Sequence, residues 1–144
     1  MQKNFSDNEI FTEYTFMLII NGQLETYLDL LKDISPYKFN KKGDITSKTF
    51  GMIKEDFFCY EEKCDSESEF NNIFNNFISN LLTHKQLLFN LKDKVRDIYI
   101  NIFIQSSEAQ ITFDFTPSNL AKLHELGIKC NFSILSWGMV LDIN

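Results

Sequence analysis

The stretch from Asp97 to Leu135 constrains the fold more than any other part of the chain, because it combines strand and helix patterns without a break. Isoleucine occupies every second position from 98 to 104, and this period of two predicts a strand with one fully buried face. A second alternation, over residues 110 to 115, follows the polar turn Ser106-Ser107-Glu108. The two alternating segments are therefore predicted to pair as an antiparallel hairpin.

A capped helix and a third strand complete this stretch. Thr116 is expected to cap the helix N-terminus, and Pro117 suits the first helical turn because it has no N–H to leave unbonded. Gly127 is expected to end the helix in the left-handed conformation. Residues 128 to 135 alternate again and predict a strand, after which residues 136 to 138 are expected to turn the chain toward a short edge strand.

The first part of the chain shows the same two periods. Residues 14 to 20 are apolar on both faces, which is typical of a central strand. Residues 23 to 34 have the spacing of an amphipathic helix, and Pro36 ends it. Residues 37 to 49 are expected to form a loop, and a strand is predicted over residues 55 to 60.

The longest helix is predicted to follow a capping motif. Ser66 and Glu69 match a capping box, in which each side chain accepts a hydrogen bond from the other residue's backbone N–H. From Phe70 to Leu82 the apolar residues follow helical spacing without interruption. Thr83-His84 is expected to bend the chain before a shorter helix.

Together these patterns predict a single α+β domain over residues 1–144, with residues 1–12 as a loose N-terminal lead-in. The expected element order is β-α-β-α-β-β-α-β, in an antiparallel sheet with helices packed mainly on one face. A chain of 144 residues, of which 44% are hydrophobic, is large enough to bury its own core. The five predicted strands lie near residues 14 to 20, 55 to 60, 98 to 105, 110 to 115 and 128 to 135.

Charge, apolar runs and cysteines narrow the class of protein. A formal net charge of −6 argues against direct nucleic-acid binding, which needs clustered Lys and Arg. The longest apolar run, Phe16 to Ile20, is too short to cross a membrane, and the first residues lack a secretory apolar segment. Three cysteines without CxxC spacing predict reduced thiols and no metal. We expect a soluble, cytoplasmic protein with no membrane partner.

The sequence has no recognisable catalytic constellation. His84 and His124 have no Cys or carboxylate at the spacing of a catalytic dyad, and no nucleotide-binding or nucleophile motif occurs. Adjacent acids such as Glu61 and Glu62 point to opposite faces of a strand, so they do not form an acid/base pair. We therefore expect no enzymatic activity, no catalytic residue and no cofactor.

One charge asymmetry indicates a binding surface. The segment from Glu55 to Glu69 is strongly acidic, with Lys63 as its one basic residue. In one interpretation these charges are solvated, and Asp65 and Glu67 stabilise the following helix through the positive end of its dipole. In the other, the segment attracts and binds a basic protein. The candidate partner-binding residues are Glu55, Asp56, Glu61, Glu62, Asp65, Glu67 and Glu69.

Several short motifs resemble a family of small bacterial proteins classed as a domain of unknown function, and the resemblance covers nearly the whole chain. The motifs are Pro36 with Lys42-Gly43, Phe113-Asp114-Phe115-Thr116-Pro117, Leu120 to Gly127, and Phe132-Ser133-Ile134. Members of this kind are similar to immunity proteins encoded beside polymorphic or contact-dependent toxins. The resemblance implies a cytoplasmic protein that binds and blocks one cognate toxin domain.

The resulting functional hypothesis is an immunity protein that neutralises a cognate toxin domain, expected to be a basic nuclease, by stoichiometric and non-catalytic binding. The alternative is a small-molecule-binding or regulatory domain with a pocket between the sheet and the helices. The sequence leaves the toxin's identity, its activity and the oligomeric state open.

Overall fold

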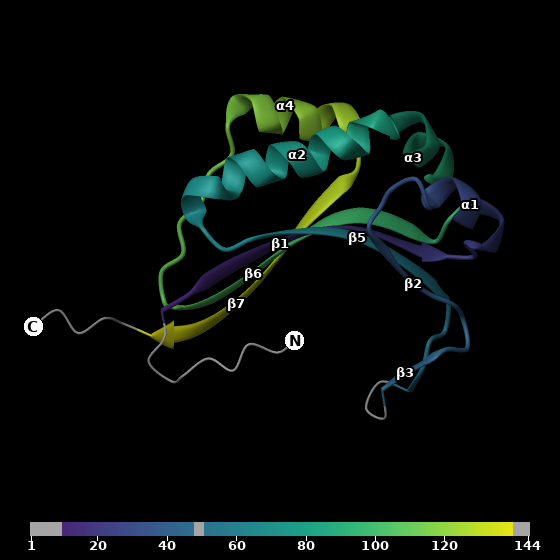
Figure 1. Ribbon diagram of the computed structural model, residues 1–144, viewed down its shortest axis with the longest axis horizontal. Helices are drawn as coiled ribbons and strands as arrows, with labels where there is room; N and C mark the ends of the chain where they lie inside the picture. Colours follow the sequence, from purple (N-terminus) through teal and green to yellow (C-terminus); the bar gives the residue numbers. More distant parts are fainter. Residues whose placement is uncertain (1–9, 48–50, 140–144) are drawn as a thin grey trace, which may run out of the picture.

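The computed structural model describes residues 10–47 and 51–139. Figure 1 shows a main sheet with the helices on a single side, and β3 and β4 form a separate two-stranded sheet. The elements are β1 (Thr12–Gly22), the 3-10 turn η1 (Glu25–Tyr27), α1 (Leu28–Leu31), β2 (Tyr37–Asn40), β3 (Ile45–Ser47), β4 (Gly51–Met52), β5 (Asp56–Cys64), η2 (Glu67–Glu69), α2 (Phe70–Thr83), α3 (Lys85–Leu91), β6 (Asp97–Glu108), α4 (Pro117–Leu126) and β7 (Lys129–Met139).

The main sheet has five strands in the order β2-β5-β1-β6-β7. All neighbours are antiparallel except β6 and β7, which are parallel. Leu18 of the central strand β1 pairs with Tyr60 on one side and Ile100 on the other. The predicted α+β class and the central place of the first strand are therefore confirmed.

The core fills the space between this sheet and α2. Phe16 and Leu18 point from β1 to the helix side and are fully buried, as are Phe74 and Phe77 on α2. The rings of Phe16 and Phe74 are 5.3 Å apart in an edge-on arrangement. Burying each such side chain contributes about 1.5–3 kcal/mol, so this layer is the main source of stability.

Helix α4 has the predicted ends. The Thr116 Oγ1 accepts a hydrogen bond from the Asn119 backbone N–H at 3.2 Å, and Gly127 has a left-handed backbone with φ of 67°. The backbone N–H of Gly127 donates to the Leu123 carbonyl at 3.2 Å. Both local signals act through backbone groups of the helix itself, which is why the sequence predicts them correctly.

The predicted strand over residues 110–115, and with it the hairpin, is wrong. Strand β6 continues through Glu108, and residues 110–115 form an irregular segment instead. The Asn71 side-chain amide donates to the Asp114 carbonyl oxygen at 3.1 Å, and its carbonyl oxygen accepts from the Thr116 N–H at 3.2 Å. The alternation of residues 110–115 reflects burial against α2, because both Phe113 and Phe115 lie 5.4 Å from the ring of Phe70.

The last strand also differs from its prediction. Strand β7 pairs with β6 in parallel rather than antiparallel, because α4 carries the chain back along the sheet between the two strands. The predicted turn at residues 136–138 is wrong, since β7 continues through it with Gly138 at φ of +70°. The predicted edge strand after β7 falls mainly on residues 140–143, outside the described residues.

Three further expectations are corrected in part. The helix expected over residues 23–34 is reduced to η1 and α1, and the loop expected over residues 37–49 contains the strands β2 and β3. The capping box is wrong: no side chain caps η2, and the Ser66 Oγ instead lies 2.7 Å from the Ser68 Oγ. The long helix and its end at His84 are confirmed by α2 and α3.

Candidate functional site

The acidic segment does not form one continuous surface. It begins just before β5, runs along the whole strand and ends at η2. An extended strand rises about 3.3 Å per residue, so Asp56 and Cys64 at the two ends of β5 are roughly 26 Å apart. The seven candidate acids therefore divide into two at one end of the sheet, two in the strand and three at the other end.

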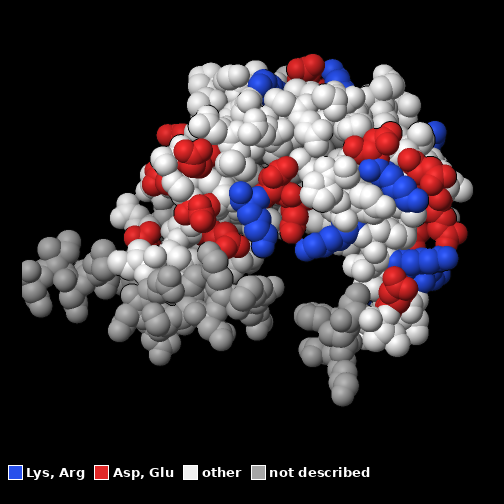
Figure 2. Space-filling view, viewed as in Figure 1, with Lys and Arg blue, Asp and Glu red and all other residues white. Residues whose placement is uncertain are grey.

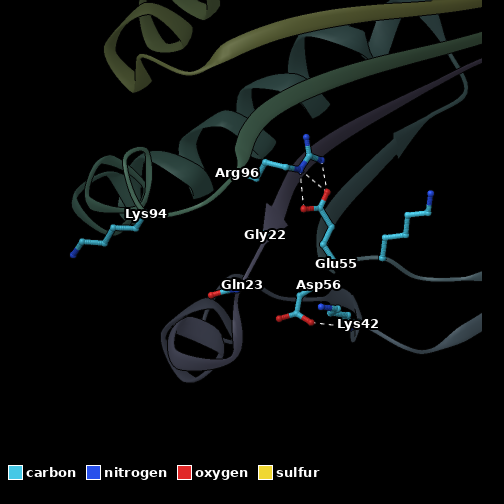
Figure 3. Close-up of a pocket in the computed structure, with 8 residues that line it drawn as sticks. Gly22, Gln23, Lys42, Glu55, Asp56, Lys94 and Arg96 are labelled. Atoms are coloured by element: carbon cyan, nitrogen blue, oxygen red, sulfur yellow. Dashed lines mark hydrogen bonds and ion pairs between the residues drawn. The ribbon is translucent and has the colours of Figure 1, made fainter.

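The two acids before and at the start of β5 are bound by other groups of the protein. The Arg96 Nε donates to both carboxylate oxygens of Glu55, at 2.5 and 2.7 Å. Asp56 is buried, and its oxygens accept from the backbone N–H groups of Leu24 at 2.9 Å and Lys42 at 2.8 Å. Figure 3 shows the bonds of Glu55 to Arg96 and of Asp56 to Lys42. Neither carboxylate is free to meet a partner.

Asp56 is held in its charged form. Burial by itself raises the pKa of this carboxyl group, but the two backbone N–H donors and the nearby Lys41 and Lys42 outweigh burial and lower the pKa. The carboxylate ties the turn after β1 to the turn after β2. It is therefore a structural group that connects two loops.

Replacing Asp56 by alanine is expected to lower the free energy of unfolding by about 2 kcal/mol at pH 7, because two backbone N–H groups lose their acceptor. The folded pKa of Asp56 lies below its unfolded value, so its stabilisation is present above the unfolded pKa and is lost as the pH falls through the folded pKa. The free energy of unfolding, measured with urea between pH 7 and pH 2, should therefore fall less steeply with acid in Asp56→Ala than in wild type.

Asp44 provides the control, because its carboxylate also accepts a backbone N–H, from Lys41 at 2.8 Å, but is exposed. Asp44→Ala is expected to cost less than Asp56→Ala. Equal losses would show that burial of Asp56 does not matter.

The two acids within β5 face opposite sides of the sheet, as their adjacency predicts. Glu61 forms an ion pair with Lys38 of β2 at 3.2 Å on the face without helices. Glu62 accepts a hydrogen bond from the Tyr60 hydroxyl at 2.9 Å, and the Asn80 side-chain amide donates to that hydroxyl at 3.0 Å. Both carboxylates are half-buried and have partners already.

The last three acids form the acidic end of the molecule, defined here as Asp65, Glu67 and Glu69. All three side chains are exposed, and no described cation forms an ion pair with them. The charge of Glu67 also acts on Tyr14. Burial is the main cause that raises the pKa of the Tyr14 hydroxyl, and the negative charge of Glu67 is the next. Figure 2 shows acidic side chains gathered on the left, where α2 begins in Figure 1. This is the part of the acidic segment whose carboxylates are exposed and form no ion pair with a described cation.

An apolar edge lies beside the acidic end, and sequence reasoning missed it. Strand β7 ends the sheet, and its outer edge pairs with no described strand. Its large apolar side chains are about half exposed: Phe132 47%, Ile134 56%, Leu135 48% and Trp137 55%. Natural edge strands usually carry charges that prevent pairing with other chains, yet residues 131–138 contain none. That run of uncharged residues was the available signal.

A second feature missed by sequence reasoning is a basic cleft at the opposite end of the sheet. It has a volume of about 310 Å³ and lies among the turns after β1, before β5 and before β6, rather than between sheet and helices. Figure 3 shows it beside the Glu55–Arg96 pair. Its lining residues are Gly22, Gln23, Lys42, Lys54, Glu55, Asp56, Lys94 and Arg96.

The three cysteines are free thiols, of which Cys59 and Cys64 are buried and Cys130 is partly buried. Burial raises the pKa of Cys59 and of Cys130 to about 11, so both remain protonated and unreactive at neutral pH. Over residues 10–47 and 51–139, no group of three or more His, Cys, Asp or Glu side chains is arranged to hold a metal ion. No helix in the same ranges is long and apolar enough to cross a membrane.

Comparison with known families places this arrangement in context. Residues 13–137 match a family described as Domain of unknown function (DUF4279). The chain belongs to the DUF4279 family. No curated protein and no solved structure matches it significantly. The acidic end, the basic cleft and the exposed residues of β7 all lie within the part of this DUF4279 protein that matches its family.

Proposed function

We propose that this DUF4279 protein is an immunity protein that binds and neutralises a cognate bacterial toxin domain by stoichiometric, non-catalytic binding. The observation that supports it best is that the acidic end and the uncharged residues 131–138 of the edge strand β7 lie at the same end of the sheet. Tyr14 pairs with Cys64 and Ile104, and Ile104 pairs with Ile134, so one row crosses from β5 to β7. With strands about 4.8 Å apart, that row is roughly 14 Å wide.

The two parts of this surface have different physical roles. Unpaired carboxylates attract a basic partner and raise the rate of encounter, an effect that salt weakens. An open strand edge offers backbone N–H and C=O groups to an extended segment of the partner, and half-exposed apolar side chains supply contact area. Trp137 is the expected anchor, because Trp is enriched among residues that dominate binding energy.

The proposed partner is a basic toxin domain of a polymorphic or contact-dependent system, met in the cytoplasm. If that domain is a nuclease, its active site binds phosphates through cationic groups. Carboxylates of Asp65, Glu67 and Glu69 would then occupy positions that substrate phosphates take. This role requires no chemistry from the immunity protein itself.

The test is coexpression with the toxin domain encoded next to its gene, followed by purification and measurement of affinity. Wild type is expected to form a one-to-one complex that weakens with salt. The triple variant Asp65→Lys, Glu67→Lys, Glu69→Lys is expected to bind at least tenfold more weakly, because each reversal replaces attraction by repulsion.

A control variant reverses three exposed acids elsewhere, Asp29→Lys, Asp33→Lys and Asp93→Lys, and thus makes the same change in net charge. It should retain affinity within a few fold. Equal weakening by both triple variants would remove the acidic end from the proposal, and the absence of any toxin gene beside this one would contradict the immunity role.

A further inference from the structure

The basic cleft contains every described lysine whose side chain has no polar partner. Six other lysines form ion pairs with carboxylates, and two more donate to neutral oxygens. The ion pairs are Lys32–Asp29, Lys38–Glu61, Lys41–Glu25, Lys63–Glu13, Lys85–Glu125 and Lys129–Asp97, and the neutral acceptors are Gly127 for Lys92 and Asn75 and Ser79 for Lys122. The ammonium groups of Lys42, Lys54 and Lys94 have none within the described ranges, and all three lysines line the cleft.

The carboxylates of the cleft neutralise only part of its positive charge, because two acids, Glu55 and Asp56, stand against three lysines and Arg96. Both oxygens of Asp56 accept backbone N–H groups, and Glu55 is bound by the Arg96 guanidinium. Glu55 thus offsets the charge of Arg96, whereas Asp56 has neutral hydrogen-bond donors and keeps its negative charge near Lys42. The cleft keeps an excess of positive charge in a chain whose formal net charge is −6.

Backbone hydrogen bonds hold the lysines around a fixed frame. The Gly43 N–H donates to the Ile53 carbonyl at 2.9 Å, and the Ile53 N–H donates to the Asp44 carbonyl at 2.8 Å. These bonds place Lys42 and Lys54 on two neighbouring segments at the base of the β3–β4 hairpin. On the other side, the Arg96 N–H donates to the Asn21 carbonyl at 3.0 Å, which fixes the turn that carries Lys94.

The arrangement of the lysines around the cleft indicates the kind of ligand. Figure 3 shows the Lys94 side chain on the far side of the cleft from Lys42, pointing away from the Glu55–Arg96 pair. Lysine has a flexible four-carbon stem, and its ammonium acts as a point charge that suits phosphate. Separated ammonium groups are better bridged by several linked phosphates than by one. The volume of about 310 Å³ is at the small end of ligand pockets.

We propose that this cleft binds a small polyphosphate anion, with the ammonium groups of Lys42, Lys54 and Lys94 as its counter-charges and Arg96 as a further donor. The site is separate from the acidic end and does not depend on toxin binding.

Calorimetric titration of the full chain with tripolyphosphate tests the proposal. Wild type is expected to show saturable one-to-one binding that weakens with salt. The triple variant Lys42→Ala, Lys54→Ala, Lys94→Ala is expected to bind at least tenfold more weakly. The three side chains are exposed, so the variant is expected to fold normally, which circular dichroism checks.

The matched control is Lys32→Ala, Lys63→Ala, Lys85→Ala, which removes the same charge from lysines that have ion-pair partners. It should bind within about twofold of wild type. Equal weakening by the two triple variants would show a general charge effect, and non-saturable binding to wild type would likewise overturn the proposal.

Glu55→Gln gives a test of opposite sign. It removes a negative charge that faces the cleft and frees donors of Arg96. One unit charge at roughly 6 Å in water corresponds to about a threefold change in affinity. Tripolyphosphate carries several negative charges, so it is expected to bind at least about threefold more tightly to Glu55→Gln, and weaker binding would contradict the assignment of this cleft.

Discussion

Replacing Phe70 by alanine is expected to lower the free energy of unfolding by about 3–5 kcal/mol, the range for truncating a buried phenylalanine. Phe70 is 1% exposed and begins α2. Its ring lies 5.0 Å from Tyr14 and 5.1 Å from Phe16 of β1, and 5.4 Å from both Phe113 and Phe115. The alanine variant loses contacts with the sheet and with the irregular segment at the same time.

Urea unfolding measures the loss, and Phe89→Ala is the matched control because Phe89 is 63% exposed. That control is expected to change stability by less than about 1 kcal/mol. Hydrogen exchange adds a local measurement: the Thr116 amide, bonded to Asn71, should exchange faster in Phe70→Ala than global unfolding explains. Equal stability of the two variants would contradict the central role of Phe70.

Replacing Gly22 by alanine is expected to cost about 2–5 kcal/mol, which combines backbone strain with a steric clash. Gly22 has φ of +143°, and a Cβ there would lie 2.8 Å from the Arg96 backbone nitrogen. That nitrogen cannot move away freely, since its N–H donates to the Asn21 carbonyl at 3.0 Å. Relief of the clash must separate the end of β1 from the start of β6.

Gly43→Ala is the control for Gly22→Ala. Gly43 also has positive φ, +96°, but nothing lies within 4 Å of a Cβ placed there. Only the conformational penalty remains, about 1–2 kcal/mol. Thermal and urea unfolding of both variants compares the two costs. A loss in Gly22→Ala no greater than in Gly43→Ala would show that the contact with Arg96 is unimportant.

Sequence patterns predicted those elements whose structure depends on their own residues. The buried isoleucines of β6, the long helix α2 and the Thr116 cap are confirmed, because periodicity and capping act within one segment. The strand predicted over residues 110–115 failed for a different reason. Its alternation was real, but Asn71 from a distant helix takes the backbone groups at Asp114 and Thr116 that a strand partner would need.

The candidate site shows the same limit. Acids that are close in sequence were treated as one surface, yet an extended strand places Asp56 and Glu69 at opposite ends of the sheet. The basic cleft shows the reverse, because Lys42, Lys54 and Lys94 come from separate turns that the topology brings together. Neither the unpaired state of these lysines nor the bonds of Glu55 to Arg96 leaves a local signal in the sequence.

The central strand β1 precedes the other four strands of its sheet in the sequence and is therefore synthesised before them. Its neighbours are made much later, since Leu18 pairs with Tyr60 and with Ile100. Pairing between such distant residues slows folding. During synthesis the apolar residues of β1 therefore have no strand partner until β5 and β6 have emerged, and this state favours aggregation. We expect the yield of folded protein to depend on chaperones that cover β1 until β6 has emerged.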